Sequence, residues 1–352
     1  MTPFIYSAQS SRIIFGAGSL AGLPAELKVL GISKALVLTT PQQAALGERV
    51  ATLLAARSVG VFSGAVMHVP IEAAVEARAV AAQLGADGCI AVGGGSTLGL
   101  AKAIALTSSL PIVAVPTTYA GSEVTPIYGL TEGGLKKTGR DLRVLPRSVI
   151  YDPELTLTLP YSMSITSGMN AIAHAAEGLY AQDGSPIIAL MAAEALRALA
   201  DALPRIQVNP HDIAARSEAL YGAWLAGTVL GHVSMGLHHK LCHTLGGSFS
   251  LPHAETHSAI LPHALAYNAS AASQAMKIMA RALGIDRVPQ DLHGLACRLG
   301  APTSLRSLGM LEDDLDLAAD LAVQTPYPNP CALHREALRE LLQRAWEGAP
   351  PA

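Results

Sequence analysis

Residues 89–106 read CIAVGGGSTLGLAKAIAL, and the prediction of the fold depends on this stretch more than on any other. Its first four residues are apolar, as in a buried strand, and the residues after the three glycines have the spacing of a helix. Glycine permits positive φ angles and lets the backbone approach a ligand closely. The helix N-terminus after the turn offers free N–H groups to a pyrophosphate. The stretch therefore predicts a strand–turn–helix unit with a candidate nucleotide site.

Alternating strand and helix patterns extend from this stretch through the first 155 residues. Such alternation predicts a parallel sheet whose strands are joined by right-handed crossovers. Ligands on a sheet of this kind bind at the carboxyl ends of its strands. The expected strands are residues 34–38, 61–67, 89–92, 111–115 and 148–151, and the expected helices are residues 42–57, 71–84 and 96–106.

The strand patterns end near Asp152-Pro153, and helical periodicity dominates the rest of the chain. We therefore predict an N-terminal α/β domain at residues 1–155, an all-helical domain at residues 156–352, and a cleft between them. The expected helices of the second domain are residues 164–180, 186–203, 213–230, 270–282 and 335–346.

The composition excludes several classes of protein. The 352 residues carry a net charge of −3 without a basic patch, so nucleic acid is a poor candidate partner. The mean hydropathy of +0.35 is high, but glycines, Lys102 and Pro116 interrupt the apolar stretches, and we expect no membrane span. The first 15 residues lack the pattern of a signal peptide. Four distant cysteines fit reduced thiols, so we expect a cytoplasmic protein.

The glycine turn alone does not establish a nucleotide site. Gly93-Gly94-Gly95-Ser96-Thr97 is not a GxGxxG fingerprint, because Leu98 occupies the third glycine position, and no GK[ST] follows as in a P-loop. By itself the turn could equally be a tight connection between strand and helix. Pro116-Thr117-Thr118 follows the next strand and places two hydroxyls beside the same crevice. Two polar loops after adjacent strands favour the nucleotide interpretation.

Histidines form a second candidate site, because seven of the twelve lie between residues 232 and 263. His239 and His243 are four residues apart and share a helical face, and His253 follows after a Gly-Gly break. A single histidine is more often a core residue than a ligand. We interpret four members of the group in that way, namely His232, His238, His257 and His263.

Asn170 and His174 have the same four-residue spacing on the helical segment SGMNAIAHAAEGLY. Together with the three histidines farther along the chain, they supply three or more imidazoles and one oxygen donor from separate helices. Such a set is a plausible site for a divalent metal. A buried histidine network that only joins the helices is the alternative.

These motifs resemble the iron-containing (group III) alcohol dehydrogenase family. The family shows a GGGS turn, a PTT…SE segment, a D-x-x-x-H helix and an H-x-x-x-H-x(9)-H segment. The matching stretches here are GGGSTLGLAK, PTTYAGSEVT, Asn170 to His174, and His239 through His253. The resemblance spans most of the chain in the same order. It implies a dinucleotide-binding α/β domain followed by a helical domain, in the fold shared with dehydroquinate synthase.

At two positions this chain departs from the family pattern, and the departures indicate one branch of the family. The aspartate that ligates metal in the family is Asn170 here, and Gly99 stands where the family often has Asp in GGGSxxDxAK. With TTYAGSE, GLTEGG and KKTGRD, these departures resemble the branch that reduces maleylacetate (4-oxohex-2-enedioate) to 3-oxoadipate with NADH or NADPH. That branch serves bacterial catabolism of resorcinol, hydroxyquinol and chlorinated aromatics. The resemblance implies a homodimer that does not require metal.

The resemblance also implies the cofactor contacts. Thr40 aligns with a position where many members carry Asp, which would repel a 2′-phosphate, so we expect both NADH and NADPH to be used. Thr39 and Gln42 are further donors to phosphate. A lysine reaches the cofactor in the family, and Lys136 matches better than Lys137. The expected cofactor residues are Thr40, Gly93, Gly94, Gly95, Ser96, Thr97, Thr117, Thr118, Ser122, Lys136 and Leu155.

The resemblance places His243 beside the nicotinamide, where it is the expected general acid. His239 and His253 would hydrogen-bond the ketone oxygen and a carboxylate, and Asn170 would donate its amide N–H to the same oxygen. With His174, these residues would form a polar, partly protonated pocket without metal. Hydride addition to a conjugated C=C bond yields a delocalised enolate, which hydrogen-bond donors stabilise without a cation.

Three alternatives stay open. The first is a metal-dependent alcohol dehydrogenase in which Asn170 ligates through its amide oxygen. The second is a lyase resembling dehydroquinate synthase, which uses NAD without net consumption. The third is a nucleotide-binding protein without catalysis, which the many ionisable side chains disfavour. Bound metal would identify the first alternative, and the absence of net NADH oxidation would identify the second.

Overall fold

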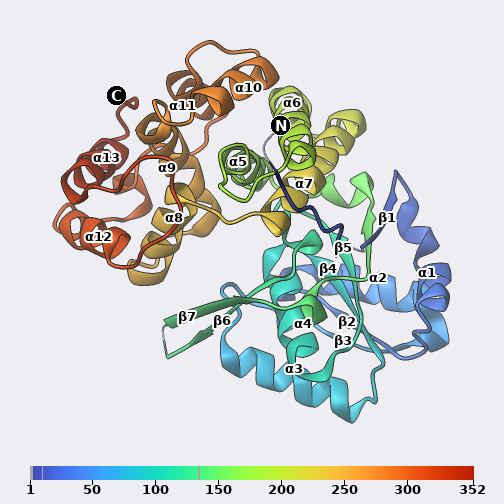
Figure 1. The fold of residues 1–352 in the computed structure, drawn as a ribbon. Coiled ribbons are helices and arrows are strands. Elements are labelled where there is room, and N and C mark those ends of the chain that lie inside the picture. Colours follow the sequence, from blue (N-terminus) through green and yellow to red (C-terminus); the bar gives the residue numbers. More distant parts are fainter. Residues whose placement is uncertain (1–2, 10, 134) are drawn as a thin grey trace. The chain divides into compact units, whose positions relative to one another are not determined.

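The structure is a computed structural model that describes residues 3–9, 11–133 and 135–352, without the side chains of Leu135 and Lys136. The chain forms two compact units (Figure 1). One unit is Ser7–Leu159, and the other is Pro160–Ala352 with the described part of residues 1–6. The sequence predicts a boundary after residue 155, and the structure divides the chain after Leu159. Among the described helices, none has the length and apolar character that a membrane crossing needs.

The α/β unit is built on one parallel sheet of six strands in the order β1-β8-β5-β4-β2-β3. The central strands are fully buried on both faces, as parallel sheets covered by helices require. This architecture confirms the predicted fold class. The strands are β1 (Arg12–Phe15), β2 (Ala35–Leu38), β3 (Ser58–Phe62), β4 (Gly88–Gly93), β5 (Ile112–Pro116) and β8 (Ser148–Tyr151).

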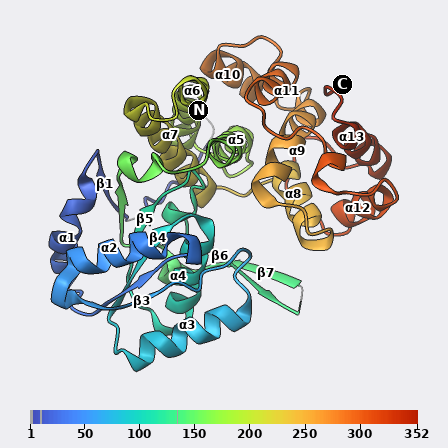
Figure 2. The same cartoon turned by 180° about the vertical axis from the view of Figure 1, so that it is seen from behind.

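Helices cover both faces of this sheet, as Figures 1 and 2 show. Leu27 and Val50, from α1 and α2, pack against Val37 and Ile90 of the sheet. The alternate strand residues face the other side of the sheet, where α4 contacts β2, β4 and β5 and α3 packs on α4. The helices are α1 (Leu23–Val29), α2 (Ala44–Leu54), α3 (Ile71–Gln83) and α4 (Gly95–Ser108), and short 3-10 turns span Ser19–Gly22, Pro41–Gln43, Ala55–Arg57, Ser122–Val124, Leu142–Val144 and Pro153–Thr156.

Two parts of this unit differ from the sequence prediction. The strand expected at residues 61–67 is wrong in position, because β3 ends at Phe62. Its neighbour β2 ends at Leu38, so the apolar residues after Phe62 have no ladder to join. The sequence prediction also omits β1 and the antiparallel hairpin of β6 (Ile127–Glu132) and β7 (Leu135–Arg140).

The helical unit surrounds a buried central helix. Every residue of α5 (Tyr161–Gly178) from Ser164 onward is buried, which places its polar side chains inside the unit. A second core joins α8, α9, α12 and α13 through leucines and alanines. The remaining helices are α6 (Pro186–Val208), α7 (Ile213–His232), α8 (Leu237–Ser248), α9 (His253–Asn268), α10 (Ser273–Leu283), α11 (Val288–Arg298), α12 (Asp314–Val323) and α13 (Arg335–Glu347), with a 3-10 turn at Arg306–Leu308.

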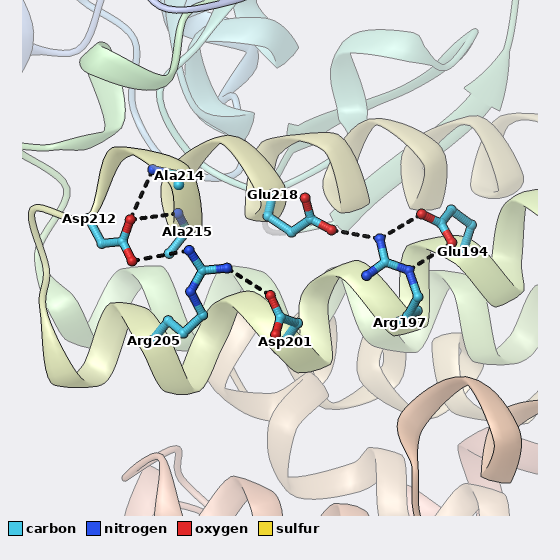
Figure 3. Close-up of polar contacts among 8 residues, drawn as sticks. All are labelled: Glu194, Arg197, Asp201, Arg205, Asp212, Ala214, Ala215 and Glu218. Atoms are coloured by element: carbon cyan, nitrogen blue, oxygen red, sulfur yellow. Dashed lines mark hydrogen bonds and ion pairs between the residues drawn. The ribbon is translucent and has the colours of Figure 1, made fainter.

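Several ion pairs lie along the α6–α7 hairpin (Figure 3). Arg197 contacts Glu194 at 2.7 Å and Glu218 at 2.6 Å. Arg205 contacts Asp201 and Asp212, and Asp212 caps α7 by accepting hydrogen bonds from the Ala214 and Ala215 N–H groups. These pairs are exposed, and such pairs add little to the free energy of folding. We therefore regard them as part of the surface of the hairpin.

Candidate active site

The strand ends of the α/β unit bring the predicted cofactor residues to one edge of the sheet. β2 and β4 are neighbours, and the strands that follow them lie on opposite sides of this pair. Such a switch point, at the carboxyl ends of the strands, is where open α/β sheets bind ligands. Thr40 follows β2, Gly93 ends β4 and Thr117 follows β5. The three loops therefore begin side by side.

Close packing explains the glycines of the turn. A Cβ atom on Gly93 would lie 2.4 Å from Thr97 Oγ1, and one on Gly94 would lie 2.9 Å from Thr118 Cγ2. Among the described residues, no atom lies within 4 Å of a Cβ position on Gly95. The N-cap Gly94 also has no side chain with which to cap the first turn of α4. This open helix N-terminus is suited to an anionic group.

Gln43, which the sequence analysis does not single out, joins these loops. Its Nε2 donates to Thr117 Oγ1 at 2.9 Å, and its Oε1 lies 2.9 Å from the Cβ position of Gly93. Gln42, the expected donor, is exposed, and Thr39 is buried with its hydroxyl bonded to Ser63. The short 3-10 turn after Thr40 decides which glutamine points inward, and the residue types alone do not reveal it.

Ser122 is held by a buried lysine of α4. Lys102 Nζ donates to the carbonyl of Ser122 at 2.7 Å, to its hydroxyl at 3.1 Å, to Thr125 Oγ1 at 3.0 Å and to the carbonyl of Ile127 at 2.7 Å. Burial lowers the pKa of Lys102 to about 7, against the opposite effect of Glu123. The observed contacts of Ser122 are thus those of a loop anchor.

Of the remaining three predicted cofactor residues, Leu155 and Lys136 lie away from the glycine turn and Ser96 lies in it. Leu155 is in the 3-10 turn after β8, where it is half-buried against the apolar core beneath the sheet. Lys136 pairs with Thr131 across the β6–β7 hairpin, and its side chain lies outside what the structure describes. Ser96 is in the first turn of α4, beside Gly95.

The helical unit brings the predicted catalytic histidines together. His174 comes from α5, His239 and His243 from α8, and His253 begins α9. The ring centroids of His174 and His239 are 5.1 Å apart, those of His239 and His243 6.3 Å, and those of His243 and His253 6.1 Å. Asn170 lies one turn before His174 on the same buried helix. Three helices therefore supply one cluster.

The cluster is buried at one end and open at the other. Asn170, His174 and His239 are each at most 5% exposed, His253 is half-buried and His243 is exposed. Burial, with the neighbouring histidines, holds the pKa of His174 well below its ordinary value. His174 is therefore neutral at neutral pH. The open position of His243 suits a group that exchanges protons with a ligand or with water.

His257 lies at the centre of the cluster and is closer to its members than the sequence analysis implies. Its ring centroid is 4.5 Å from that of His253 and 5.1 Å from that of His239, and its Nδ1 lies 2.9 Å from Nε2 of His238. The ligand atoms of His238, Cys242 and His257 lie within 4.8 Å of one another. Burial lowers the pKa of both histidines and raises that of the thiol, so this buried group is uncharged.

The cluster contains donors of the kind that a divalent metal takes. Asn170 Oδ1, His174 Nδ1 and His239 Nε2 are buried without a hydrogen-bond partner among the described residues. His239 Nδ1 contacts Oε2 of Glu177 at 2.6 Å, and such a carboxylate commonly lies behind a metal-bound imidazole. These atoms are therefore of the types that bind a divalent metal. The set nonetheless lacks an anionic ligand, since Asn170 stands where a carboxylate would bind.

Glu177 is not among the residues predicted for the site, although it is buried in the same helix as His174. A signal for it exists in the sequence. Glu177 lies three residues after His174 on a helix that is otherwise apolar or small in side chain, so it faces the same side of the helix.

The chain matches the models of a known protein family over most of its length. Residues 10–153 match the model of the iron-containing alcohol dehydrogenases, and residues 164–346 match the C-terminal model of the Fe-containing alcohol dehydrogenase family.

Individual relatives align with the whole chain. A maleylacetate reductase of Burkholderia cepacia is 61% identical over 352 residues and covers 100% of both chains. A maleylacetate reductase of Pseudomonas knackmussii is 57% identical and covers 99% of both. The crystal structure of maleylacetate reductase from Agrobacterium tumefaciens matches with a TM-score of 0.97 and 54% identity, covering 100% of both chains.

Proposed function

The chain belongs to the iron-containing alcohol dehydrogenase family, and from this premise we propose that it is a maleylacetate reductase. Its reaction is the reduction of the conjugated C=C bond of maleylacetate to 3-oxoadipate by a nicotinamide coenzyme. The observation that carries this proposal is the 61% identity to a maleylacetate reductase over the full length of both chains. The enzyme is thus an oxidoreductase that acts on a CH–CH bond.

The reaction requires one hydride and one proton. A reduced nicotinamide coenzyme, which the glycine turn and the loops after β2 and β5 would hold, would supply a hydride to C2 of maleylacetate, and the electrons of the C=C bond would move toward the ketone oxygen. The resulting enolate takes a proton at C3, which gives 3-oxoadipate and the oxidised coenzyme. The protein has to stabilise the enolate oxygen and to deliver this proton.

We assign the proton to His243 and the binding of the substrate to its neighbours. His243 is the exposed member of the cluster, one helical turn from His239, so it can both protonate the enolate carbon and regain a proton from water. Asn170 offers an amide N–H to the developing negative charge on the oxygen. His174, His239 and His253 complete a compact polar pocket for a dicarboxylate.

The coenzyme is a nicotinamide dinucleotide, and we propose that NADH and NADPH are both accepted. Thr40 carries no charge at the end of β2, so it neither binds the ribose hydroxyls as a carboxylate would nor repels a 2′-phosphate. The open first turn of α4 is suited to the pyrophosphate. We place Thr117, Thr118 and Lys136 among the remaining contacts.

We further propose that the reaction does not need a metal, although the family is named for iron. Asn170, His174, His239 and His253 would hold a dication, which would supply Lewis-acid stabilisation of an alkoxide. Reduction of a conjugated C=C bond forms an enolate, whose charge is spread over carbon and oxygen. Hydrogen-bond donors suffice for such a charge. A donor set without a carboxylate also holds a dication weakly. We propose a cytoplasmic homodimer on the family resemblance.

The test is an assay of NADH oxidation by the purified protein, with maleylacetate or with simple aldehydes, each with and without EDTA. We expect one NADH oxidised per maleylacetate, no loss in EDTA, and little activity with aldehydes. Loss of activity in EDTA, with a stoichiometric metal in the purified protein, would identify a metal-dependent alcohol dehydrogenase instead. Turnover of a substrate without net NADH oxidation would identify a lyase.

A further inference from the structure

Glu177 is a buried carboxylate that no lysine or arginine contacts in the described part of the chain. It is 1% exposed, and its strongest ionisable partner is His239 at 2.6 Å. Burial of an unpaired carboxylate is costly, so its hydrogen-bond donors account for its presence in the core. One of those donors is the hydroxyl of Tyr180, at 3.4 Å from Oε1, and the others lie at the start of α8.

The two oxygens of Glu177 cap the N-terminus of α8. They accept hydrogen bonds from the N–H groups of Gly236 at 3.2 Å, His238 at 2.9 Å and His239 at 3.3 Å. The N–H of Leu237 donates instead to Asn329 Oδ1 at 3.3 Å. The N-cap Gly236 supplies no side chain of its own. A carboxylate here is also favoured by the positive end of the helix dipole.

Gly236 favours this arrangement. A Cβ atom at this position would lie 3.1 Å from the carbonyl oxygen of Pro328, 3.2 Å from Oε1 of Glu177 and 3.2 Å from Oδ1 of Asn329. Another residue at position 236 would therefore push these groups away from the first turn of α8 by a few tenths of an ångström. The start of the helix that carries His239 and His243 is consequently fixed by side chains from outside it.

The same carboxylate determines which nitrogen of His239 carries the hydrogen. A carboxylate can only accept, so Nδ1 of His239 is the protonated nitrogen in their 2.6 Å contact. Nε2 is then the atom that faces the cluster, where it is buried without a partner among the described residues. The ring is also held by stacking on His174, with 5.1 Å between centroids.

We propose that Glu177 is a positioning residue for the reduction: it holds the ring of His239 through Nδ1–H and turns Nε2, which can then only accept, toward the cluster. The hydrogen bond to the ketone oxygen is then donated by Asn170 and not by His239, which corrects the expectation from the sequence. This inference rests on the proposed function for its kinetic part only. The orientation of the ring and the location of its hydrogen can be measured without substrate.

The first experiment is a two-bond ¹H–¹⁵N correlation spectrum of the full chain with ¹⁵N-labelled histidine, in which His239→Gln identifies the His239 signals. We expect the Nδ1 of His239 to have the chemical shift of a protonated nitrogen. A spectrum in which His239 Nδ1 is unprotonated would overturn the proposal, whatever the substrate of the enzyme.

The second experiment compares Glu177→Gln with Asn329→Ala. Glu177→Gln weakens the cap of α8, because one acceptor oxygen remains, and Asn329→Ala removes the acceptor for the Leu237 N–H, but only Glu177 also contacts His239. We expect Glu177→Gln to change the His239 signals and to lower kcat by about 10- to 100-fold, by analogy with the loss of the carboxylate partner of a metal-binding histidine, with the KM for the coenzyme unchanged. Asn329→Ala should lower the melting temperature and leave the His239 signals as they are.

Glu177→Asp keeps the charge and should recover part of the lost kcat. An equal loss of kcat in Asn329→Ala and Glu177→Gln would reduce Glu177 to a helix cap and contradict the proposal. Unchanged His239 signals in a folded Glu177→Gln variant would contradict it as well.

Discussion

A Cβ atom on Gly99 would lie 2.5 Å from Cγ2 of Val69, so the helix α4 and the loop before α3 share a space that holds only one side chain. Val69 is 6% exposed and has a φ of 47°, a region that β-branched residues rarely adopt. The family often has Asp where this chain has Gly99. In this chain, the absence of a side chain at position 99 leaves the space that Val69 occupies.

We expect Gly99→Asp to lower the free energy of unfolding by about 1–3 kcal/mol, the usual cost of inserting atoms into a packed interior. Val69→Ala removes the obstructing methyl groups, so the double variant should recover part of that loss. Chemical denaturation of the two single variants and the double variant measures the coupling. Gly95→Ala is the control, because no described atom lies within 4 Å of its Cβ position. Strict additivity of Gly99→Asp and Val69→Ala would contradict the shared space.

Lys102 should make the stability of the enzyme depend on pH. Burial lowers its pKa in the folded state to about 7, against 10.5 for an ordinary lysine. Between these values the unfolded chain binds more protons than the folded one. The free energy of unfolding should therefore rise with pH across this window, by at most about 1.4 kcal/mol per pH unit.

Lys102→Met should flatten that rise. Denaturation at pH 7, 8 and 9 compares the slopes, and Lys28→Met, at an exposed lysine of α1, is the control. Glu123 lies near Lys102, and burial raises the pKa of Glu123. The comparison therefore uses the difference in the free energy of unfolding between variant and parent at each pH. Equal slopes in both proteins would show that Lys102 keeps its proton throughout.

The α/β unit is largely predictable from the sequence, because strands buried on both faces give continuous apolar runs. Residues 89–92, 111–115 and 148–151 are such runs, and each coincides with an observed strand. The hairpin of β6 and β7 is different, since its exposed and half-buried residues give no such pattern. Strand β3 shows that the end of a strand depends on its neighbour, which lies far along the chain.

The histidine cluster is predictable only in part. Spacing identifies His239 and His243 as a pair, and it also singles out His174 and His253 as candidates, while the family resemblance assigns roles to them. Spacing does not reveal that α5 and α9 bring Glu177 and His257 into contact with that pair. Such contacts depend on the packing of three helices, and no local pattern records it. The same limit applies to Gln43, whose direction depends on a single 3-10 turn.

Thr40→Asp should make the enzyme prefer NADH over NADPH. We expect the parent to use NADH and NADPH with kcat/KM values within about tenfold of each other, a difference of about 1.4 kcal/mol. A carboxylate at the end of β2 would accept hydrogen bonds from the ribose hydroxyls and repel a 2′-phosphate, so the variant should favour NADH by a further tenfold or more. Thr40→Asn is the uncharged control. A parent preference above a hundredfold for either coenzyme would refute the expectation.

Asn170→Asp should create a tighter metal site. The change adds an anionic ligand to three imidazoles, so we expect the affinity for Zn²⁺ to increase by tenfold or more. Without metal, the buried carboxylate should lower the melting temperature, and added Zn²⁺ should restore it, because binding stabilises the folded state. Asn268→Asp is the control, since Asn268 is also fully buried but pairs with Asn329 outside the cluster. The same response to Zn²⁺ in both variants would contradict the assignment of Asn170 to the metal-type donor set of the cluster.

His243→Ala tests the proposed proton donor. His243 follows His239 by one turn of α8, its ring lies 6.1 Å from that of His253, and it is the exposed member of the cluster. Removal of a general acid usually lowers the rate by about 10²-fold or more, so kcat with maleylacetate should fall on that scale while the KM for the coenzyme changes little. His232→Ala is the matched control, because His232 stacks on Tyr6, with 5.3 Å between centroids, and was interpreted as a core residue. Added imidazole should restore part of the activity to His243→Ala by supplying the missing proton. A kcat close to that of the parent would remove His243 from the chemistry and leave the enolate to be protonated by water.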